Sequence, residues 1–350
     1  MTSLSLITKD EYLKDLIYQI KNLDSNQEVY LMTMTFDHAG EQIKLLIETL
    51  NNALARNIEV TLLIDAQIYI FRNFKYLLGP LFYSSSLKKT YLSGRWYKEL
   101  NNILDNLESN GAKLKIINKP NRLFSSPFKG RSHIKISLIG EILYIGGANL
   151  VDDNHHDYMV KLENLKSISK LRDLVIDIHK KERVSESILE DIQLLTFKDT
   201  KIMVDRGLPL SSRILSTAIQ LIEASKEEII FTCQFFPDRT ILHPLYQAAK
   251  RGIKVKIVFN HHSKHFFPLS LVQYLMFVTR LGRRLSNLQY IRNDPRDRFL
   301  HAKILLVDNN LLIGSHNLVG AGVKYGTAEI ALIDNNTVLS SKLKNIFKPW

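Results

Sequence analysis

The sequence predicts an α/β fold built from two related halves, and two observations carry this prediction. The order strand, helix, strand occurs twice, at residues 28–36, 41–56 and 58–64 and again at 228–236, 239–251 and 253–259. Units of this size favour a parallel or mixed sheet covered by helices. In addition, a short motif of His, Lys, Gly and Asn is present twice, with one copy in each half.

Each half also opens with a predicted helix. Thr8 and Glu11 have the spacing of a capping box, in which each side chain satisfies the other residue's backbone N–H. Ser211 or Ser212 begins an apolar-periodic stretch that runs to residue 224. A further helix is expected over residues 167–181, after which the first half ends.

We place the boundary between the halves within residues 182–205, so that residues 1–195 form the first half and 196–350 the second. This connection is not rich in Gly or Ser, which predicts tight packing of the halves rather than free movement. Because the duplication supplies two copies of each element, no dimer is needed and a monomer is expected.

The composition indicates a folded, basic protein. Of its 350 residues, 45% are hydrophobic and 23% charged, and the net charge is +12 with a pI near 9.5. This charge favours a polyanionic partner such as nucleic acid, anionic lipid headgroups or a phosphorylated substrate, without choosing among them. A basic surface with no special partner is the alternative.

Three features bear on the compartment. Cys233 is the single cysteine, which excludes a disulfide or a thiol metal site within the chain and fits a core position. The first residues lack the basic and apolar regions of a secretory signal. No run of about 18 apolar residues suggests a membrane-spanning helix. We expect a cytoplasmic protein, with peripheral contact to the inner face of the membrane as an option.

The repeated motif has the same spacing in both halves. In each copy the first glycine lies 13 residues after the His, and the Asn lies 16 residues after it. The copies read His133-Ile134-Lys135 with Gly146-Gly147-Ala148-Asn149, and His301-Ala302-Lys303 with Gly314-Ser315-His316-Asn317. Alternation along a strand places the His and the Lys of each copy on one face. A pair of such strands related by a two-fold axis would bring both copies of the motif together at the interface between the halves, which we call the seam.

These residue types suit the cleavage of a phosphodiester. One neutral imidazole can attack phosphorus, while the other donates a proton to the leaving oxygen and then accepts one from the incoming hydroxyl. Lys135 and Lys303 can hold the phosphoryl oxygens as point charges, and Asn149 and Asn317 can add directed donors. Gly147 and Ser315, inside the motifs, are assigned to phosphate binding. No metal and no cofactor is expected.

Three acids are candidates for orienting the imidazoles. Asp157 and Glu329 follow the two motifs at parallel positions on strand-like runs, and a carboxylate on one ring nitrogen fixes the tautomer of a histidine. The alternative for both is a surface acid at the start of a strand. Asp308 lies seven residues after His301, where the first copy has Gly140; its alternative reading is turn chemistry.

Two segments are expected near the site. Residues 67–110 are aromatic and basic, and residues 264–284 are apolar with basic flanks. Both can be core helices, or a rim that lies on a bilayer interface or stacks on nucleic-acid bases. The remaining histidines come in clusters without the Cys or acidic partners of a zinc site, and two of them, His262 and His265, can stand at the entrance. The cluster members are His155, His156, His261, His262 and His265.

These residues resemble the phospholipase D superfamily, whose signature is His-x-Lys-x(4)-Asp followed by Gly-Gly or Gly-Ser and Asn. The second copy matches in full from His301 to Asp308, and the first matches except at Gly140. The resemblance covers about residues 10–348. Within the superfamily the chain is similar to bacterial cardiolipin synthases, through residues 144–150 with Asp157, and through 236–238 followed by 248–255.

The resemblance implies two α-β-α sandwich halves related by a pseudo-two-fold axis, with the active site at their seam. It also implies metal-independent exchange of a phosphatidyl group through a phosphohistidine, with His133 as the nucleophile and His301 as the acid and base. Relatives such as tyrosyl-DNA phosphodiesterases lack the Asp that Gly140 replaces and still work.

Three functions are compatible with the sequence. The first is a phosphodiesterase or phosphatidyltransferase that acts on phospholipids at an anionic membrane surface. The second is a metal-independent nuclease or nucleic-acid phosphodiesterase of the same superfamily, which the net charge and the aromatic, basic segment favour. The third is a non-catalytic phosphate binder, for which Gly140 is the support. The fold alone does not decide the substrate.

Overall fold

The computed structural model describes residues 3–70, 95–119, 129–163, 168–187, 192–197, 200–260, 285–294, 297–335 and 337–349. The expected rim at 264–284, the aromatic, basic stretch 71–94, and His261, His262 and His265 lie outside these residues. The end of the first of these segments is helix α5 (Arg95–Ser109), which buries Tyr97, Leu100, Leu104 and Leu107 in the core.

The first half contains a mixed sheet of seven strands in the order β1-β8-β6-β5-β2-β3-β4. Strands β2, β3 and β4 pair in parallel, and the other pairs are antiparallel. The strands are β1 (Ser3–Thr8), β2 (Glu28–Thr33), β3 (Glu59–Asp65), β4 (Lys113–Ile117), β5 (Ile136–Ile139), β6 (Ile142–Gly146) and β8 (Tyr158–Glu163).

The second half repeats this sheet strand for strand. Its order is β13-β12-β11-β15-β16-β17-β10-β9, with β9 added at the edge. The predicted duplicated α/β fold is therefore confirmed. The strands are β9 (Ile192–Phe197), β10 (Thr200–Arg206), β11 (Glu228–Cys233), β12 (Lys254–Phe259), β13 (Leu288–Arg292), β15 (Ile304–Val307), β16 (Asn310–Gly314) and β17 (Ala328–Asp334). Since β9 belongs to the second sheet, a division after residue 195 passes through a strand, and we propose a division before Ile192.

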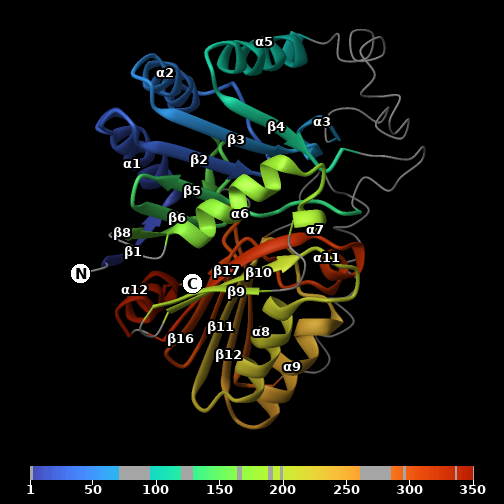
Figure 1. Cartoon of the computed structure of the whole chain (residues 1–350). Coiled ribbons are helices and arrows are strands. Elements are labelled where there is room, and N and C mark those ends of the chain that lie inside the picture. The colour runs from blue at the N-terminus through green and yellow to red at the C-terminus, as the bar shows by residue number, and fades with distance from the viewer. Residues whose placement is uncertain are drawn as a thin grey trace.

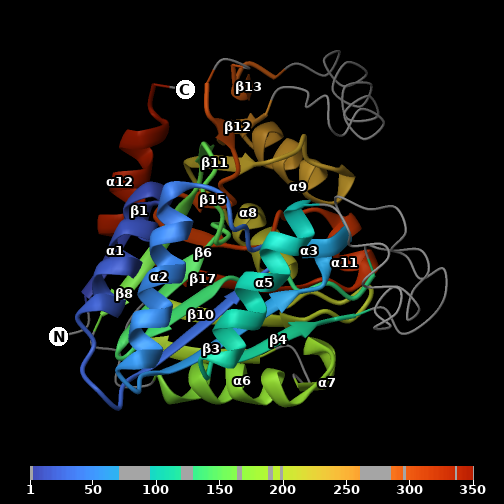
Figure 2. The same cartoon turned by 90° about the horizontal axis from the view of Figure 1, so that it is seen from above.

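The helices lie in layers on the two sheets (Figures 1 and 2). Helices α1 (Lys9–Lys21), α2 (Glu41–Ala55) and α5 pack on the outer face of the first sheet. Helices α8 (Arg213–Glu223) and α9 (Arg239–Lys250) pack on the outer face of the second. On the inner faces lie α6 (Ser169–Lys180) and α12 (Thr337–Phe347). Short helices are α3 (Gln67–Ile70), α7 (Val184–Ser187) and α11 (Gly320–Tyr325).

The predicted helix starts are formed by their own side chains. Thr8 accepts from the backbone N–H of Glu11, whose carboxylate accepts from the backbone N–H of Thr8 at 2.7 Å. Ser212 caps α8 by accepting from the N–H of Leu215 at 2.9 Å. Such caps satisfy N–H groups that a helix leaves without partners.

The inner faces of the two sheets share one hydrophobic core. Met32, Ile136 and Ile145 from the first sheet cluster with Leu306 and Ile330 from the second, all at most 2% exposed. Strand β6 contacts both β16 and β17. The halves therefore pack directly against each other. In the described part of the chain, no helix is both long enough and apolar enough to cross a bilayer.

Candidate active site

Backbone hydrogen bonds tie each motif to the opposite half. The N–H of His133 donates to the carbonyl of Ala328 at 2.8 Å, and the N–H of His301 donates to the carbonyl of His156 at 2.8 Å. A two-stranded parallel ribbon of β7 (His155–His156) and β14 (Phe299–Leu300) extends the second contact. The residues after Ala328 and His156 are Glu329 and Asp157. Each histidine is thus set beside the acid of the other half.

The side chain of His133 completes the first crossed pair. Its Nδ1 lies 2.8 Å from the carbonyl oxygen of Ser315 and 3.1 Å from Oε2 of Glu329. Both partners are acceptors, so Nδ1 carries the proton and Nε2 keeps its lone pair. Burial lowers the pKa of His133 more than the charge of Glu329 raises it. The ring is therefore held neutral at pH 7.

The side chain of His301 forms the second crossed pair. Its Nδ1 lies 2.5 Å from Oδ2 of Asp157 and 3.0 Å from Nζ of Lys303. Burial, followed by the charges of Lys303 and Lys135, lowers the pKa of His301 well below its usual value. The charge of His133 contributes in the same direction, which shows that the two imidazoles belong to one electrostatic cluster.

The two orienting carboxylates differ in their acidity. Burial would raise the pKa of Glu329, but the charge of His133 and its hydrogen bond hold that pKa at about 2. For Asp157, burial raises the pKa and outweighs the opposing charge of Lys303. Glu329 is consequently ionised at neutral pH, whereas the raised pKa of Asp157 means that this carboxylate binds a proton more readily.

The two lysines are buried beside the histidines. Nζ of Lys135 donates to the carbonyl of His133 at 2.9 Å, and Nζ of Lys303 donates to the carbonyl of His301. Burial, with mutual repulsion, lowers the pKa of Lys135 to about 7, and burial lowers that of Lys303 to about 8. Each ammonium has three donors, so both have N–H groups left for a ligand.

The two motif asparagines retain free hydrogen-bonding capacity. Oδ1 of Asn317 is buried and has no partner among the described residues. Oδ1 of Asn149 lies 3.5 Å from the hydroxyl of Thr33, at the limit of a hydrogen bond. A buried amide without partners is costly unless a ligand satisfies it.

Gly147 and Ser315 contact the two orienting acids: Gly147 leaves space for Asp157, and Ser315 forms a hydrogen bond with Glu329. A Cβ on Gly147 would lie 2.3 Å from Oδ1 of Asp157, so only glycine leaves room for that carboxylate. The hydroxyl of Ser315 donates to Glu329 and accepts from the N–H of Ile330 at 3.0 Å. Ser315 is 0% exposed. We therefore propose that these two residues position the acids instead of binding phosphate.

Asp308 lies away from both imidazoles, at a turn. Its carboxylate accepts from the backbone N–H groups of Lys226, Glu227 and Glu228 at 2.9–3.0 Å, which caps the start of β11. Its φ is +55°, and Gly140 at the matching turn also has φ +55°. We therefore propose turn chemistry for Asp308 in place of the expected orienting role, because its carboxylate accepts from backbone N–H groups and forms no hydrogen bond or ion pair with His301.

Two polar side chains that the sequence interpretation missed, one buried and one half-buried, hold the residues before the histidines. Oδ2 of Asp65 accepts from the N–H of Ser132 at 2.6 Å, and Oδ1 of Asn260 accepts from the N–H of Leu300 at 2.7 Å. Asp65 ends β3, and Asn260 directly follows β12. Aligning the two halves could have singled them out, since the strands that precede them correspond.

A third imidazole lies beside His301. The ring of His155 is near-parallel to that of His301, with centroids 5.6 Å apart and an interplanar angle of 29°. Its neighbour His156 contributes a backbone carbonyl to His301. Among the described residues no group of three His, Cys, Asp or Glu side chains is arranged to hold a metal ion.

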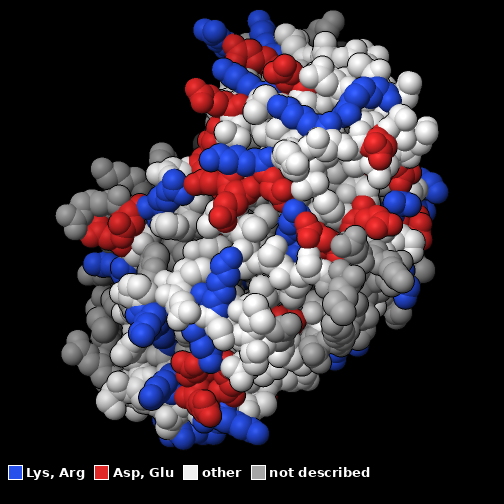
Figure 3. All heavy atoms as spheres, turned by 90° about the vertical axis from the view of Figure 1, so that its left-hand side faces the viewer, with Lys and Arg blue, Asp and Glu red and all other residues white. Residues whose placement is uncertain are grey.

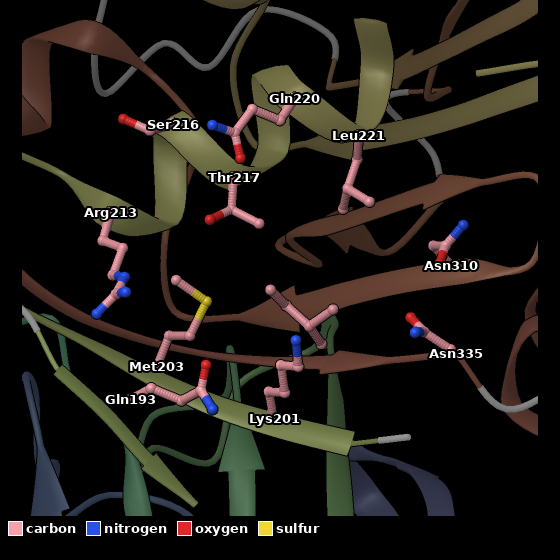
Figure 4. A pocket seen from close by; sticks show the side chains of 11 residues that line it. Gln193, Lys201, Met203, Arg213, Ser216, Thr217, Gln220, Leu221, Asn310 and Asn335 are labelled. Atoms are coloured by element: carbon pink, nitrogen blue, oxygen red, sulfur yellow. The ribbon is translucent and has the colours of Figure 1, made fainter. Parts of the chain in front are cut away.

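A separate hollow of about 460 Å³ lies between α8 and the edge of the second sheet (Figure 4). Its walls combine apolar residues such as Met203, Leu221 and Ile333 with polar ones such as Lys201 and Arg213. None of the motif residues lines it, so it is distinct from the paired histidines.

The comparisons with known proteins agree with this geometry. A family model described as "Cardiolipin synthase, PLD-like domain" matches residues 218–350. Cardiolipin synthase B of Shigella flexneri is 27% identical over 216 residues, which cover 54% of this chain and 48% of that protein. The alignment therefore spans about half the length of this curated relative.

Two solved structures share the fold over almost the whole chain. Phosphatidylserine synthase of Haemophilus influenzae Rd KW20 has a TM-score of 0.67 at 15% identity, covering 98% of this chain and 84% of its own. Polyphosphate kinase of Porphyromonas gingivalis has a TM-score of 0.61 at 12% identity, covering 99% of this chain and 50% of its own. At these identities the likeness concerns the fold.

The family match covers residues 218–350, which include the second copy of the motif, and the shared fold extends over almost the whole chain. The chain is therefore similar to PLD-like cardiolipin synthases in its second half, and to phosphatidylserine synthase in its overall fold.

Proposed function

We propose that this protein is a phosphodiesterase and phosphatidyltransferase that acts on phospholipids through a phosphohistidine intermediate. The observation that carries the proposal is the crossed pairing of His133 with Glu329 and of His301 with Asp157. A phosphoryl transfer in two steps needs one imidazole as nucleophile and a second as proton carrier. Both pairs depend on residues from the two halves.

The tautomer of His133 supports its role as the nucleophile. Because Nδ1 faces two acceptors, Ser315 and Glu329, the lone pair is on Nε2. In the first step Nε2 forms a bond to phosphorus, and the bond between phosphorus and the leaving oxygen breaks. The carboxylate of Glu329 then stabilises the cationic phosphohistidine.

The environment of His301 supports its role as the proton carrier. In the first step its Nε2 gives a proton to the leaving oxygen. In the second step it takes the proton of the incoming alcohol or water, whose oxygen bonds to phosphorus as the bond to His133 breaks. Asp157, at 2.5 Å from Nδ1, stabilises the imidazolium. A bound phosphate offsets the charges of Lys135 and Lys303 that keep this ring neutral when the site is empty.

The lysines and asparagines would neutralise the phosphoryl oxygens. Two ammonium groups and two amides from both halves supply donors that do not need to reorganise during the reaction. The phospholipid class is supported by the cardiolipin synthase-like family match and by the fold of phosphatidylserine synthase.

The sharpest test uses bis-p-nitrophenyl phosphate, whose leaving group needs no acid. His301→Gln should release about one equivalent of p-nitrophenol and then stop, since the adduct on His133 lacks a general base for hydrolysis. Mass spectrometry should locate the p-nitrophenylphosphoryl group on His133. His133→Gln should give no burst, and His243→Gln, at an exposed site on α9, should match the wild type. Full turnover by His133→Gln would overturn the proposal.

The substrate class is tested in the same preparation. Vesicles of phosphatidylglycerol should yield new phospholipid or phosphatidic acid, and the products should disappear in His133→Gln. Metal-independent cleavage of DNA without lipid turnover would instead select the nuclease, which the net charge of +12 favours. On the face shown in Figure 3, basic and acidic side chains are interspersed, whereas a nucleic-acid surface has its cations grouped.

A further inference from the structure

The imidazole of His155 forms a third pair of histidine and carboxylate at the site. Its Nδ1 lies 3.1 Å from Oδ2 of Asp153, and Asp153 is in turn paired with the ammonium of Lys9, which is 3% exposed. The ring is also packed on Phe299, with centroids 5.0 Å apart. His155 is therefore fixed by contacts on several sides, as is typical of functional side chains.

The free edge of this ring is an acceptor. The carboxylate of Asp153 lies 3.1 Å from Nδ1, and its negative charge favours the neutral tautomer with the proton on Nδ1 and the lone pair on Nε2. Among the described residues none forms a hydrogen bond with Nε2, and the side chain is 35% exposed. Burial lowers the pKa of His155, which favours this neutral form at pH 7. An unpaired acceptor selects an O–H or N–H donor rather than a phosphoryl oxygen.

The position of His155 places that acceptor on the side of the proton carrier. The near-parallel ring of His301 is its neighbour, with centroids 5.6 Å apart. In the second half the residue that corresponds to His155 is Thr327, two positions before Glu329. The feature is thus present beside His301 and not beside His133. It breaks the symmetry of the site on the side where alcohols leave and arrive.

We propose that His155 binds the acceptor alcohol, with Nε2 accepting a hydrogen bond from a second hydroxyl while His301 deprotonates the reacting one. The inference rests on the proposed function and adds a specificity-determining residue to it. It predicts that polyhydric alcohols are better acceptors than monohydric ones, because a monohydric alcohol donates its single O–H to His301 and has none left for His155.

The test compares transfer with hydrolysis, using bis-p-nitrophenyl phosphate as the donor and glycerol as the acceptor. The wild type should form glyceryl p-nitrophenyl phosphate. His155→Leu, which has no acceptor, should raise the KM for glycerol and lower the ratio of transfer to hydrolysis, each by about tenfold, the effect of losing one hydrogen bond. The initial burst of p-nitrophenol, which reports the first step, should be unchanged.

His155→Phe separates the hydrogen bond from the packing. It keeps an aromatic ring against His301 and Phe299 but has no acceptor, so it should behave like His155→Leu. A ratio of transfer to hydrolysis equal to that of the wild type in His155→Phe, or in both variants, would overturn the inference. His243→Gln is the matched histidine control. A wild type that releases no p-nitrophenol would reject the proposed function itself, and the two failures are therefore distinct.

Discussion

At the scale of single residues, the most informative finding is the exchange of acids between the halves. Glu329 serves His133 and Asp157 serves His301. Each acid directly follows a residue whose carbonyl accepts from the N–H of the opposite histidine. One backbone hydrogen bond thereby sets the register for a side-chain contact. Neither half holds a complete pair of imidazole and carboxylate on its own.

Removing the charge of Glu329 should impair the nucleophile. In Glu329→Gln the amide can turn a donor toward Nδ1, which favours the wrong tautomer and leaves the phosphohistidine without a counter-ion. We expect kcat on bis-p-nitrophenyl phosphate to fall about 10²- to 10⁴-fold. Glu227→Gln, at an exposed position, is the control. An unaltered kcat in Glu329→Gln would show that this carboxylate does not orient His133.

At the scale of elements, residues at the ends of strands position the site, whereas the hairpin turns at the other end of the strands contribute to stability. Asp65 and Asn260, at the carboxyl ends of β3 and β12, hold the segments that lead to the histidines. At the opposite end, the turns at Gly140 and Asp308 join the paired strands β5–β6 and β15–β16. The Asp that distinguishes the two motifs therefore belongs to a turn that caps β11.

Exchanging the turn residues should separate stability from catalysis. Asp308→Asn weakens three hydrogen bonds to backbone N–H groups and should lower the free energy of unfolding by about 1–3 kcal/mol, with kcat unchanged. Gly140→Asp should also keep its kcat, since its Cβ would meet no atom closer than 3.5 Å; its left-handed φ costs at most about 1–2 kcal/mol. Denaturant unfolding and turnover measure the two effects. Loss of kcat in folded Asp308→Asn would restore Asp308 to the site.

At the scale of the whole molecule, the site is one electrostatic cluster that the shared core brings together. Lys135 and Lys303 come from different halves, yet each lowers the pKa of His301. The hydrophobic residues of the two inner sheet faces form a single cluster behind them. Packing of the halves therefore places two cations in a dry environment, where their charge is costly until an anion binds.

This arrangement predicts a pH dependence of anion binding. The pKa values of Lys135 and Lys303 are about 7 and about 8, so both are protonated at pH 6 and mostly neutral at pH 9. Between these values and 10.5 the unfolded chain binds more protons, so these lysines make the empty protein more stable as the pH rises. Sulfate, whose charge is constant here, requires the protonated form.

The affinity for sulfate should therefore fall as the pH rises through 7 and 8, by up to about tenfold per pH unit for each lysine that must be charged. The measurement is the sulfate-induced increase in Tm from pH 6 to pH 9. Lys135→Gln and Lys303→Gln should each weaken binding at pH 6 and flatten the curve. A constant affinity across this range would contradict the assignment of the lysines to the phosphate.

The sequence by itself determined the duplication, the order of strands and helices, and the residue types at the site. These are properties of local patterns: periodicity, caps, and a motif repeated at equal spacing. The family resemblance added the expected pairing of two imidazoles. Asp157 and Glu329 were candidates because they follow their motifs at parallel positions.

Only the tertiary structure decided which acid meets which histidine, because that depends on how the halves pack rather than on distance along the chain. It also favoured the turn alternative for Asp308, since the residue has a φ of +55° and accepts from three backbone N–H groups. The position of His155 was likewise decided by the tertiary structure. Its sequence context resembles a loop, but β7 pairs with β14 and the ring of His155 packs against that of His301. Side-chain chemistry is local, but the contacts that give it a role are made across the seam.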